Sequence, residues 1–101
     1  MKSALVLTAR DNVATALVAL EPGQAVALDA GSLTPRERIP SGHKIALVAI
    51  AAGEPVIKYG QPIGLATSAI QAGDHVHTHN LSSTRGRGDL ELRAVPREDE
   101  P

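Results

Sequence analysis

Histidines at positions 75, 77 and 79 are the strongest chemical signal in the sequence. Alternate residues of an extended strand face the same side, so a strand here would present all three imidazoles together. Neutral imidazole is the commonest metal-ligating side chain, and two of them at this spacing can share one ion. His75 and His79 would lie about 13 Å apart on a straight strand, which favours two histidines plus an outside ligand. A solvated polar strand face is the alternative.

Polar side chains also gather near the ends of other apolar runs. Asn80 follows the histidines directly, and its amide can both donate and accept, which suits orienting a ligand or a substrate hydroxyl. Lys58 and Tyr59, the only aromatic residue, precede Gly60 and together suit a substrate carboxylate. The alternative for this pair is a core ring beside a solvated lysine.

Two further polar clusters lie earlier in the chain. The segment from Ser41 to Lys44, which includes His43, suits anion binding or acid–base chemistry, with an ordinary loop as the alternative. Asp11 and Asn12 are typical of a helix cap. A Ser/His/Asp triad, a Walker loop and a dinucleotide motif are all missing from the sequence, so we expect no nucleophilic or nucleotide chemistry from this chain alone.

Short apolar runs separated by Gly and Pro predict a mostly β domain. The expected strands are 4–8, 45–50, 55–59, 63–66 and 75–79. Three segments that begin at Leu20, Ile50 and Ile70 share one pattern: aliphatic, two residues, Gly, two residues, Val. A glycine with positive φ would close a turn there, and the valine would enter the next strand.

The remaining segments predict one helix, one loop and a tail. Asp11 as N-cap, followed by apolar residues at 13, 16, 17 and 20, favours a two-turn helix that ends before Pro22. Residues 29–42 are rich in turn formers and are expected to form a loop with functional potential. We therefore expect one domain over residues 1–81 and a polar, mobile tail over 82–101, to which Leu90, Leu92 and Val95 could add an edge strand.

Composition limits the function further. The 101 residues suit one domain, and 43% apolar content without Cys, Phe or Trp predicts an aliphatic core free of disulfides. A net charge of −1 with scattered Lys and Arg argues against nucleic-acid binding. The apolar run at 4–8 is too short for a signal peptide or membrane span, so we expect a cytoplasmic protein without membrane attachment.

Several of these motifs together resemble one known module. They are Asp11-Asn12-Val13-Ala14, Gly42 to Leu47, Gly53 to Gly60 with Ile63-Gly64, and Gly73 to Asn80. In this order, over about residues 8–81, they resemble the N-terminal domain of altronate and galactarate dehydratases, which is also the separate small subunit of sulfolactate sulfo-lyase. The resemblance implies an SAF domain with the β-clip fold of short twisted strands, here expected to carry one short helix.

The resemblance also implies a chemistry. The resemblance implies a metal-dependent elimination from a 2-hydroxy acid that gives a 2-keto acid. The implied metal is usually divalent iron, and manganese is the other candidate. The family motif Val-His-x-His-Asn maps onto residues 76–80 and leaves His75 outside, which makes His75 auxiliary. We therefore expect the following roles: metal ligands His77 and His79; catalytic residues His43, Lys58, Tyr59 and Asn80; substrate-binding residues Asp11, Asn12 and Lys44.

The family further implies a partner, because its larger domain carries most of the catalytic site. We expect a large catalytic dehydratase subunit and a small hydroxyacid substrate. The alternatives are the small subunit of a sulfolactate sulfo-lyase, or a non-catalytic SAF module that binds carbohydrate or stabilises its partner. The sequence leaves open which acid is processed, which ion is bound and whether the chain forms a homo-oligomer.

Overall fold

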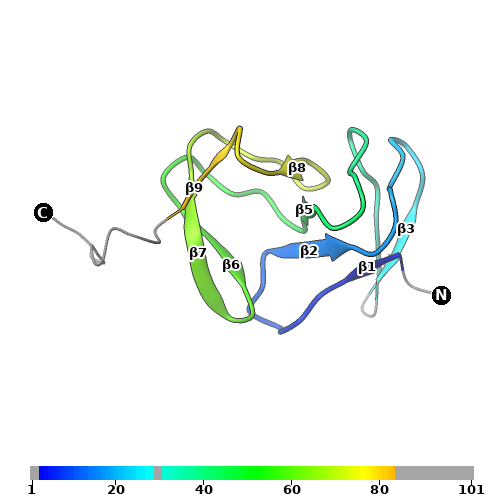
Figure 1. Cartoon of the computed structure of the whole chain (residues 1–101), viewed down its shortest axis with the longest axis horizontal. Helices are drawn as coiled ribbons and strands as arrows, with labels where there is room; N and C mark the ends of the chain where they lie inside the picture. Colours follow the sequence, from blue (N-terminus) through cyan, green and yellow to red (C-terminus); the bar gives the residue numbers. More distant parts are fainter. Residues whose placement is uncertain (1–2, 29–30, 84–101) are drawn as a thin grey trace, which may run out of the picture.

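The computed structural model describes residues 3–28 and 31–83, which fold into short antiparallel strands (Figure 1). The strands are β1 (Ala4–Leu5), β2 (Val13–Ala16), β3 (Val26–Leu28), β4 (Gly31–Leu33), β5 (Lys44–Ala46), β6 (Pro55–Lys58), β7 (Gln61–Ala66), β8 (His75–Val76) and β9 (Leu81–Ser83). They form a four-stranded sheet in the order β1-β2-β5-β8, a three-stranded sheet in the order β6-β7-β9, and the β3–β4 hairpin. The predicted mostly β class is confirmed.

The predicted helix after Asp11 is wrong, because the described residues contain no helix. These residues therefore include no helix that could cross a membrane. The segment instead forms β2, which pairs with β1 on one side and with β5 on the other. Val13, Ala14 and Ala16 are each only 1% exposed. A central strand buried on both faces gives a nearly continuous apolar run, which local periodicity cannot distinguish from a helical face.

The loop predicted over residues 29–42 is wrong in part. Gly31–Leu33 form β4, which pairs with β3 in a hairpin, and Ile39 is fully buried in the core. The strands predicted at 55–59 and 63–66 are observed as β6 and β7, whereas those at 4–8, 45–50 and 75–79 shrink to two or three residues. Strand β9 spans 81–83, and the rest of the expected tail, including Leu90, Leu92 and Val95, lies outside the described residues.

The predicted glycine turns are confirmed, and the structure adds a fourth. Gly23, Gly53 and Gly73 have φ of 80°, 87° and 92°, and Gly42 has 86°. Each turn is closed by the same backbone hydrogen bond, in which the residue after the glycine donates to the carbonyl three positions earlier. The aliphatic residues that begin the four units pair as Leu20 with Ile39 and Ile50 with Ile70. One strand–turn unit is thus used four times.

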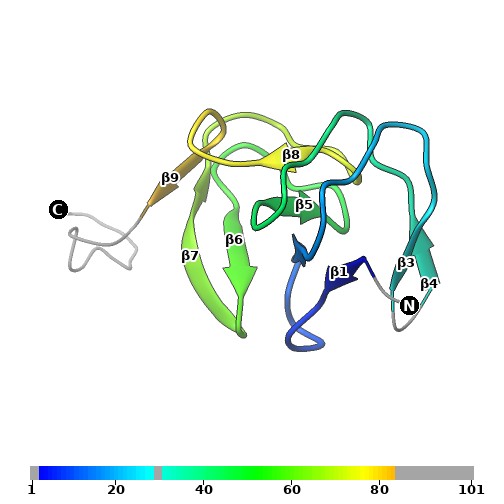
Figure 2. The same ribbon diagram turned by 45° about the vertical axis from the view of Figure 1, so that its right-hand side comes forward.

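The aliphatic core divides into two clusters on either side of the β2–β5 pair. Alternate residues of these strands point to opposite clusters, so Ala14 and Ile45 join the first while Val13 and Ala46 join the second. In Figure 2, β6, β7 and β9 lie on one side of β5 and the β3–β4 hairpin lies on the other. Strand β8 lies at the edge of the central sheet, next to β5.

Candidate functional site

The pairing of β5 with β8 brings a fourth histidine to the predicted histidine strand. The register joins Lys44 to Val76 and Ile45 to His75. Continued by one position beyond the strand ends, it places His43 opposite His77. The two rings stack with centroids 4.2 Å apart and planes 20° apart. Residues from two distant segments therefore form a single cluster.

His43, His75 and His77 converge more closely than the sequence suggested. His43 Nδ1 lies 2.9 Å from His75 Nε2, and one ring nitrogen of each residue lies within 4.8 Å of the others. All three side chains are half-buried. Their stacked rings leave nitrogen atoms of three imidazoles available to one small ligand.

His79 lies beside this group but outside it. The predicted separation of about 13 Å from His75 is wrong, because β8 ends at Val76 and the chain then enters a turn. The ring centroids of His75 and His79 are 5.4 Å apart, with their planes tilted by 47°. The structure thus brings all four histidines close together, but only His43, His75 and His77 have ring nitrogens that all lie within 4.8 Å of one another.

Two histidines of the cluster, His75 and His77, favour the neutral imidazole because their pKa is lowered. Burial lowers the pKa of His75, and the neighbouring His43 lowers it further while Glu37 opposes the shift. Burial likewise lowers the pKa of His77, with His43 and Lys44 adding to the effect. A neutral ring keeps one nitrogen lone pair free for a proton or a metal ion. These two residues therefore offer lone pairs at neutral pH.

Asn80 fixes the segment that carries the histidines. Its side chain is buried, its Oδ1 accepts the backbone N–H of His77 at 3.0 Å, and its Nδ2 donates to the carbonyl of His75 at 2.9 Å. The carbonyl of Asn80 in turn accepts the N–H of Thr67. These bonds give Asn80 a positioning role, and direct contact with substrate stays a prediction.

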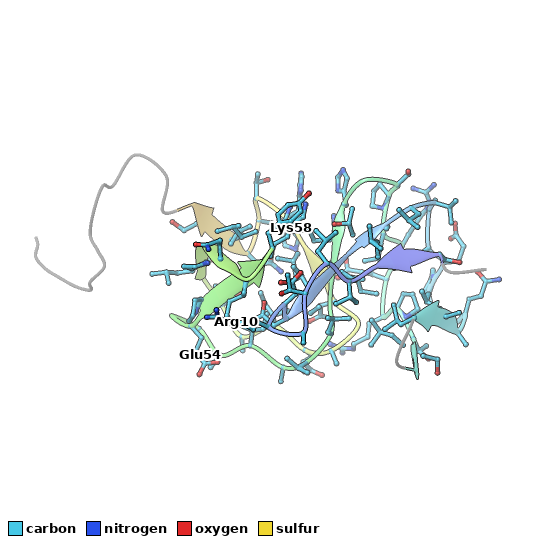
Figure 3. The ribbon with its side chains drawn as sticks, turned by 90° about the horizontal axis from the view of Figure 1, so that it is seen from below. Arg10, Glu54 and Lys58 are labelled. Carbon is cyan, nitrogen blue, oxygen red and sulfur yellow. The ribbon has the colours of Figure 1, made fainter. Side chains whose placement is uncertain are left out.

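Lys58 and Tyr59 lie at the tip of the β6–β7 hairpin. Tyr59 and Gly60 form its two-residue loop with φ of 59° and 70°, the positive values that a type I′ turn requires. The Tyr59 side chain is 63% exposed, and Lys58 Nζ lies 5.3 Å from its ring centroid. The core-ring alternative is therefore wrong. Figure 3 shows Lys58 at the opposite end of β6 from Glu54.

Lys44 links this hairpin to the histidine cluster. Burial lowers the pKa of Lys44, and the charge of Lys58 lowers it further. Lys44 also acts on His77, so its amino group lies within electrostatic reach of both sets of residues. Lys44 beside the imidazole cluster, with the charge of Lys58 within electrostatic reach of Lys44, makes this face suitable for a carboxylate.

Asp11 and Asn12 join the start of β2 to the same hairpin. Asn12 Oδ1 accepts the N–H of Ile57 at 2.7 Å, and its Nδ2 donates to the carbonyl of Pro55 at 3.0 Å. Asp11 accepts hydrogen bonds from the Thr8 hydroxyl at 2.6 Å and the Gly60 N–H at 2.8 Å. The two side chains therefore have structural roles, while their binding of substrate stays a prediction.

Glu37 is the site neighbour that sequence reasoning missed. Its Oε2 accepts the backbone N–H of His75 at 3.2 Å, which places a carboxylate beside the cluster. Glu37 lies in the segment 29–42, whose turn-forming composition indicated functional potential without singling out any residue. Its position depends on the fold of that segment against β8, which no local pattern encodes.

Comparison with known proteins identifies the family of this chain. The family described as the altronate/galactarate dehydratase SAF domain matches residues 2–84. The chain belongs to this family. An altronate dehydratase from Escherichia coli is 53% identical over 72 residues, which are 71% of this chain and 14% of the relative. An altronate dehydratase from Bacillus subtilis is 37% identical over 99% of this chain and 20% of the relative.

A third relative has a different size. The (2R)-sulfolactate sulfo-lyase subunit alpha of Paracoccus pantotrophus is 49% identical over 53 residues, which are 52% of this chain and 79% of that subunit. This SAF domain therefore corresponds to a small fraction of the dehydratases and to most of a named enzyme subunit. The resemblance found in the sequence motifs is confirmed.

Proposed function

We propose that this SAF domain is part of a metal-dependent hydroxyacid lyase and works together with a large catalytic dehydratase polypeptide. The observation that carries the proposal is the convergence of His43, His75 and His77 beside Lys44, in a domain whose relatives are named as dehydratases and a lyase subunit. The reaction is elimination of water from a sugar acid of the altronate or galactarate type. The C2 proton and the C3 hydroxyl depart, and the resulting enol becomes a 2-keto acid.

The residues of this face match the needs of such an elimination. Lys44 and Lys58 supply positive charge for the substrate carboxylate, and the exposed Tyr59 hydroxyl can bond to the polyol chain. His43 belongs to the converging group, so its proposed catalytic contribution is to help hold the metal ion. Asn80 holds the histidine segment in place.

The donor set fits the divalent iron that the family resemblance implies. Imidazole nitrogen suits iron well, whereas manganese prefers oxygen ligands and fits less well. When bound, such an ion stabilises the negative charge that develops on the substrate oxygens. His77 belongs both to the family motif and to the converging group, so it is the best-supported ligand, whereas His79 belongs to the motif but lies outside that group.

The proposed large polypeptide is supported by the small share of the dehydratases that this domain matches. The chain spans 14% and 20% of the two altronate dehydratases, so most of their length has no counterpart here. A half-buried histidine face on so small a domain stays in contact with water, which weakens electrostatic catalysis. A large polypeptide that covers this face would exclude the water and supply the missing groups.

Sulfolactate is the second candidate substrate. The chain matches 79% of a sulfo-lyase subunit alpha, which favours a two-subunit enzyme of that kind. Sulfite would then leave in place of hydroxide, from the same position relative to the carboxylate. A non-catalytic SAF module would bind carbohydrate or stabilise a partner without needing the histidines.

The test is a reconstitution assay. The large catalytic polypeptide is assayed with iron and D-altronate, galactarate or sulfolactate, in the presence and absence of this domain, for 2-keto acid or sulfite. We expect turnover only when both parts are present. The combined variant His43→Gln and His77→Gln serves as the comparison, and full activity with it would favour a structural module. An unchanged rate without the domain would overturn the proposal.

A further inference from the structure

We propose that His43, His75 and His77 form a three-histidine site that binds one divalent transition-metal ion on this domain alone, with His79 outside the ligand set. This inference rests on the proposed function and deepens it by assigning the ligands. It departs from the family motif, which includes His77 and His79 but neither His43 nor His75.

The fold brings the three ligands together through two independent constraints. The β5–β8 register places His43 opposite His77, and the turn closed by Gly42 leads directly into His43. On the other side, Asn80 bonds to the backbone of both His75 and His77. The backbone positions of the three residues are therefore set before any ion binds, which lowers the cost of assembling the site.

The separations between the nitrogen atoms suit a metal shell after small side-chain movements. Nitrogen ligands at about 2.0–2.1 Å from a tetrahedral ion lie about 3.3 Å from one another. His43 Nδ1 and His75 Nε2 are 2.9 Å apart, and no pair in the group exceeds 4.8 Å. Rotation of the side chains is therefore sufficient to bring the three nitrogen atoms to the separations that a metal ion requires.

The stacking of the rings predicts which movement occurs. A metal ion lies in the plane of each imidazole that binds it, along the nitrogen lone pair. The rings of His43 and His77 are stacked face to face, with planes 20° apart, and cannot both meet this condition as they stand. Binding must therefore rotate these rings and open the stack, which should change their NMR resonances strongly.

His79 is a less suitable ligand for the same ion. It lies on the turn after β8, its side chain is exposed, and its ring is tilted by 47° from that of His75. Its nitrogen atoms do not share the close group formed by the other three. Three nitrogen ligands leave a coordination position free for water or a substrate oxygen, as in catalytic metal sites.

The experiment uses the whole chain without a polyhistidine tag and without any partner or substrate. Zn²⁺ binding is measured by calorimetry, Co²⁺ binding by its visible absorption, and the imidazole resonances by NMR. His43→Gln, His75→Gln and His77→Gln are each expected to weaken Zn²⁺ binding by at least about tenfold, and the matched control His79→Gln by less than about twofold. Unfolding midpoints show that each variant is folded.

Two results would overturn the inference. One is a loss on His79→Gln as large as that on His77→Gln while His43→Gln has no effect, because the motif pair would then be the ligands. The other is the absence of histidine-specific binding by the folded chain. The binding measurements do not involve turnover. Metal binding by these three histidines in a complex without lyase activity would therefore contradict the proposed function but support the metal site.

Discussion

Asp11 and Gly60 are 49 positions apart in the sequence, yet Asp11 Oδ1 accepts the backbone N–H of Gly60 at 2.8 Å. The same carboxylate binds the Thr8 hydroxyl and the Thr8 N–H. It therefore fastens the segment before β2 to the hairpin tip that exposes Tyr59. The residue that the sequence suggested as a helix cap instead holds two distant turns together.

Asp11→Asn should destabilise the domain by about 1–3 kcal/mol at neutral pH, because a charged acceptor of several hydrogen bonds is lost. Burial raises the pKa of Asp11, but the bonds from Thr8, Gly60 and Tyr59 outweigh burial and lower the pKa from 3.8 to about 2. Because the pKa of Asp11 is lower in the folded state, its ionised carboxylate stabilises the folded domain above pH 3.8. This stabilisation is lost as the pH falls toward 2. Urea unfolding at pH 7, 4 and 2.5 measures this dependence.

The difference between wild type and Asp11→Asn should therefore shrink on acidification. Glu21→Gln is the matched control, because the Glu21 carboxylate is exposed and its ion pair with Arg38 is a surface contact. That change should alter stability by less than about 1 kcal/mol. A difference for Asp11→Asn that stays constant down to pH 2.5 would contradict the role assigned to its charge.

Tyr59→Asn should stabilise the domain by about 1 kcal/mol, because Asn tolerates the left-handed conformation better than a bulky residue. Tyr59 has φ of 59° and is 63% exposed, so little buried area is lost. If the ring contacts substrate, the same variant should lower lyase activity in the reconstituted enzyme. Chemical denaturation and steady-state kinetics together check both expectations. A gain in stability without loss of activity would remove Tyr59 from the proposed site.

Gly53→Ala and Gly73→Ala compare two turns of the repeated unit. Both glycines have positive φ, so either alanine introduces strain of about 1–2 kcal/mol. A Cβ at Gly53 meets nothing within 4 Å, whereas one at Gly73 would collide with the Thr34 carbonyl and crowd Arg36. We expect a total loss of about 3–5 kcal/mol for Gly73→Ala, measured by urea unfolding. Equal losses would show that the packing against Thr34 is unimportant.

Local patterns predicted the turns and longer strands well, because their causes are local. Gly23, Gly53 and Gly73 need positive φ wherever they occur in this pattern. The two-residue hairpin loop at Tyr59 and Gly60 was not predicted, because Tyr59 was expected in the strand 55–59. The fourth unit, from Ile39 to Ile45, follows the same pattern with Ile in place of Val and was not recognised as a repeat.

Strand β2 and the arrangement of the histidines could not be predicted in this way, because both depend on pairing between distant segments. Strand β2 is a strand because β1 and β5 flank it, whatever the spacing of its apolar residues. His43 meets His77 only through the β5–β8 register, and His79 turns aside only because β8 ends at Val76. The sequence motif indicated histidine chemistry, whereas the strand pairing determines which histidines lie close together.

Asn80→Ala should weaken Zn²⁺ binding by about 10–100-fold, although Asn80 offers no ligand to the proposed site. Its amide accepts the N–H of His77 and donates to the carbonyl of His75, so its removal frees the backbone that presents both imidazoles. The buried partners left unsatisfied should also cost about 1–3 kcal/mol of stability. Calorimetry with Zn²⁺ and urea unfolding measure the two effects.

A positioning role of Asn80 predicts that a conservative variant regains part of the Zn²⁺ affinity. Asn80→Asp keeps the Oδ1 acceptor for His77 but loses the donor to His75, so it should restore part of the Zn²⁺ affinity. Thr78→Ala, at an exposed position of the same turn, is the control and should bind Zn²⁺ like the wild type. Amide exchange at His77 should rise in Asn80→Ala and remain slower in Asn80→Asp. If Asn80→Ala binds Zn²⁺ normally despite faster exchange at His77, the order of this segment does not govern the site.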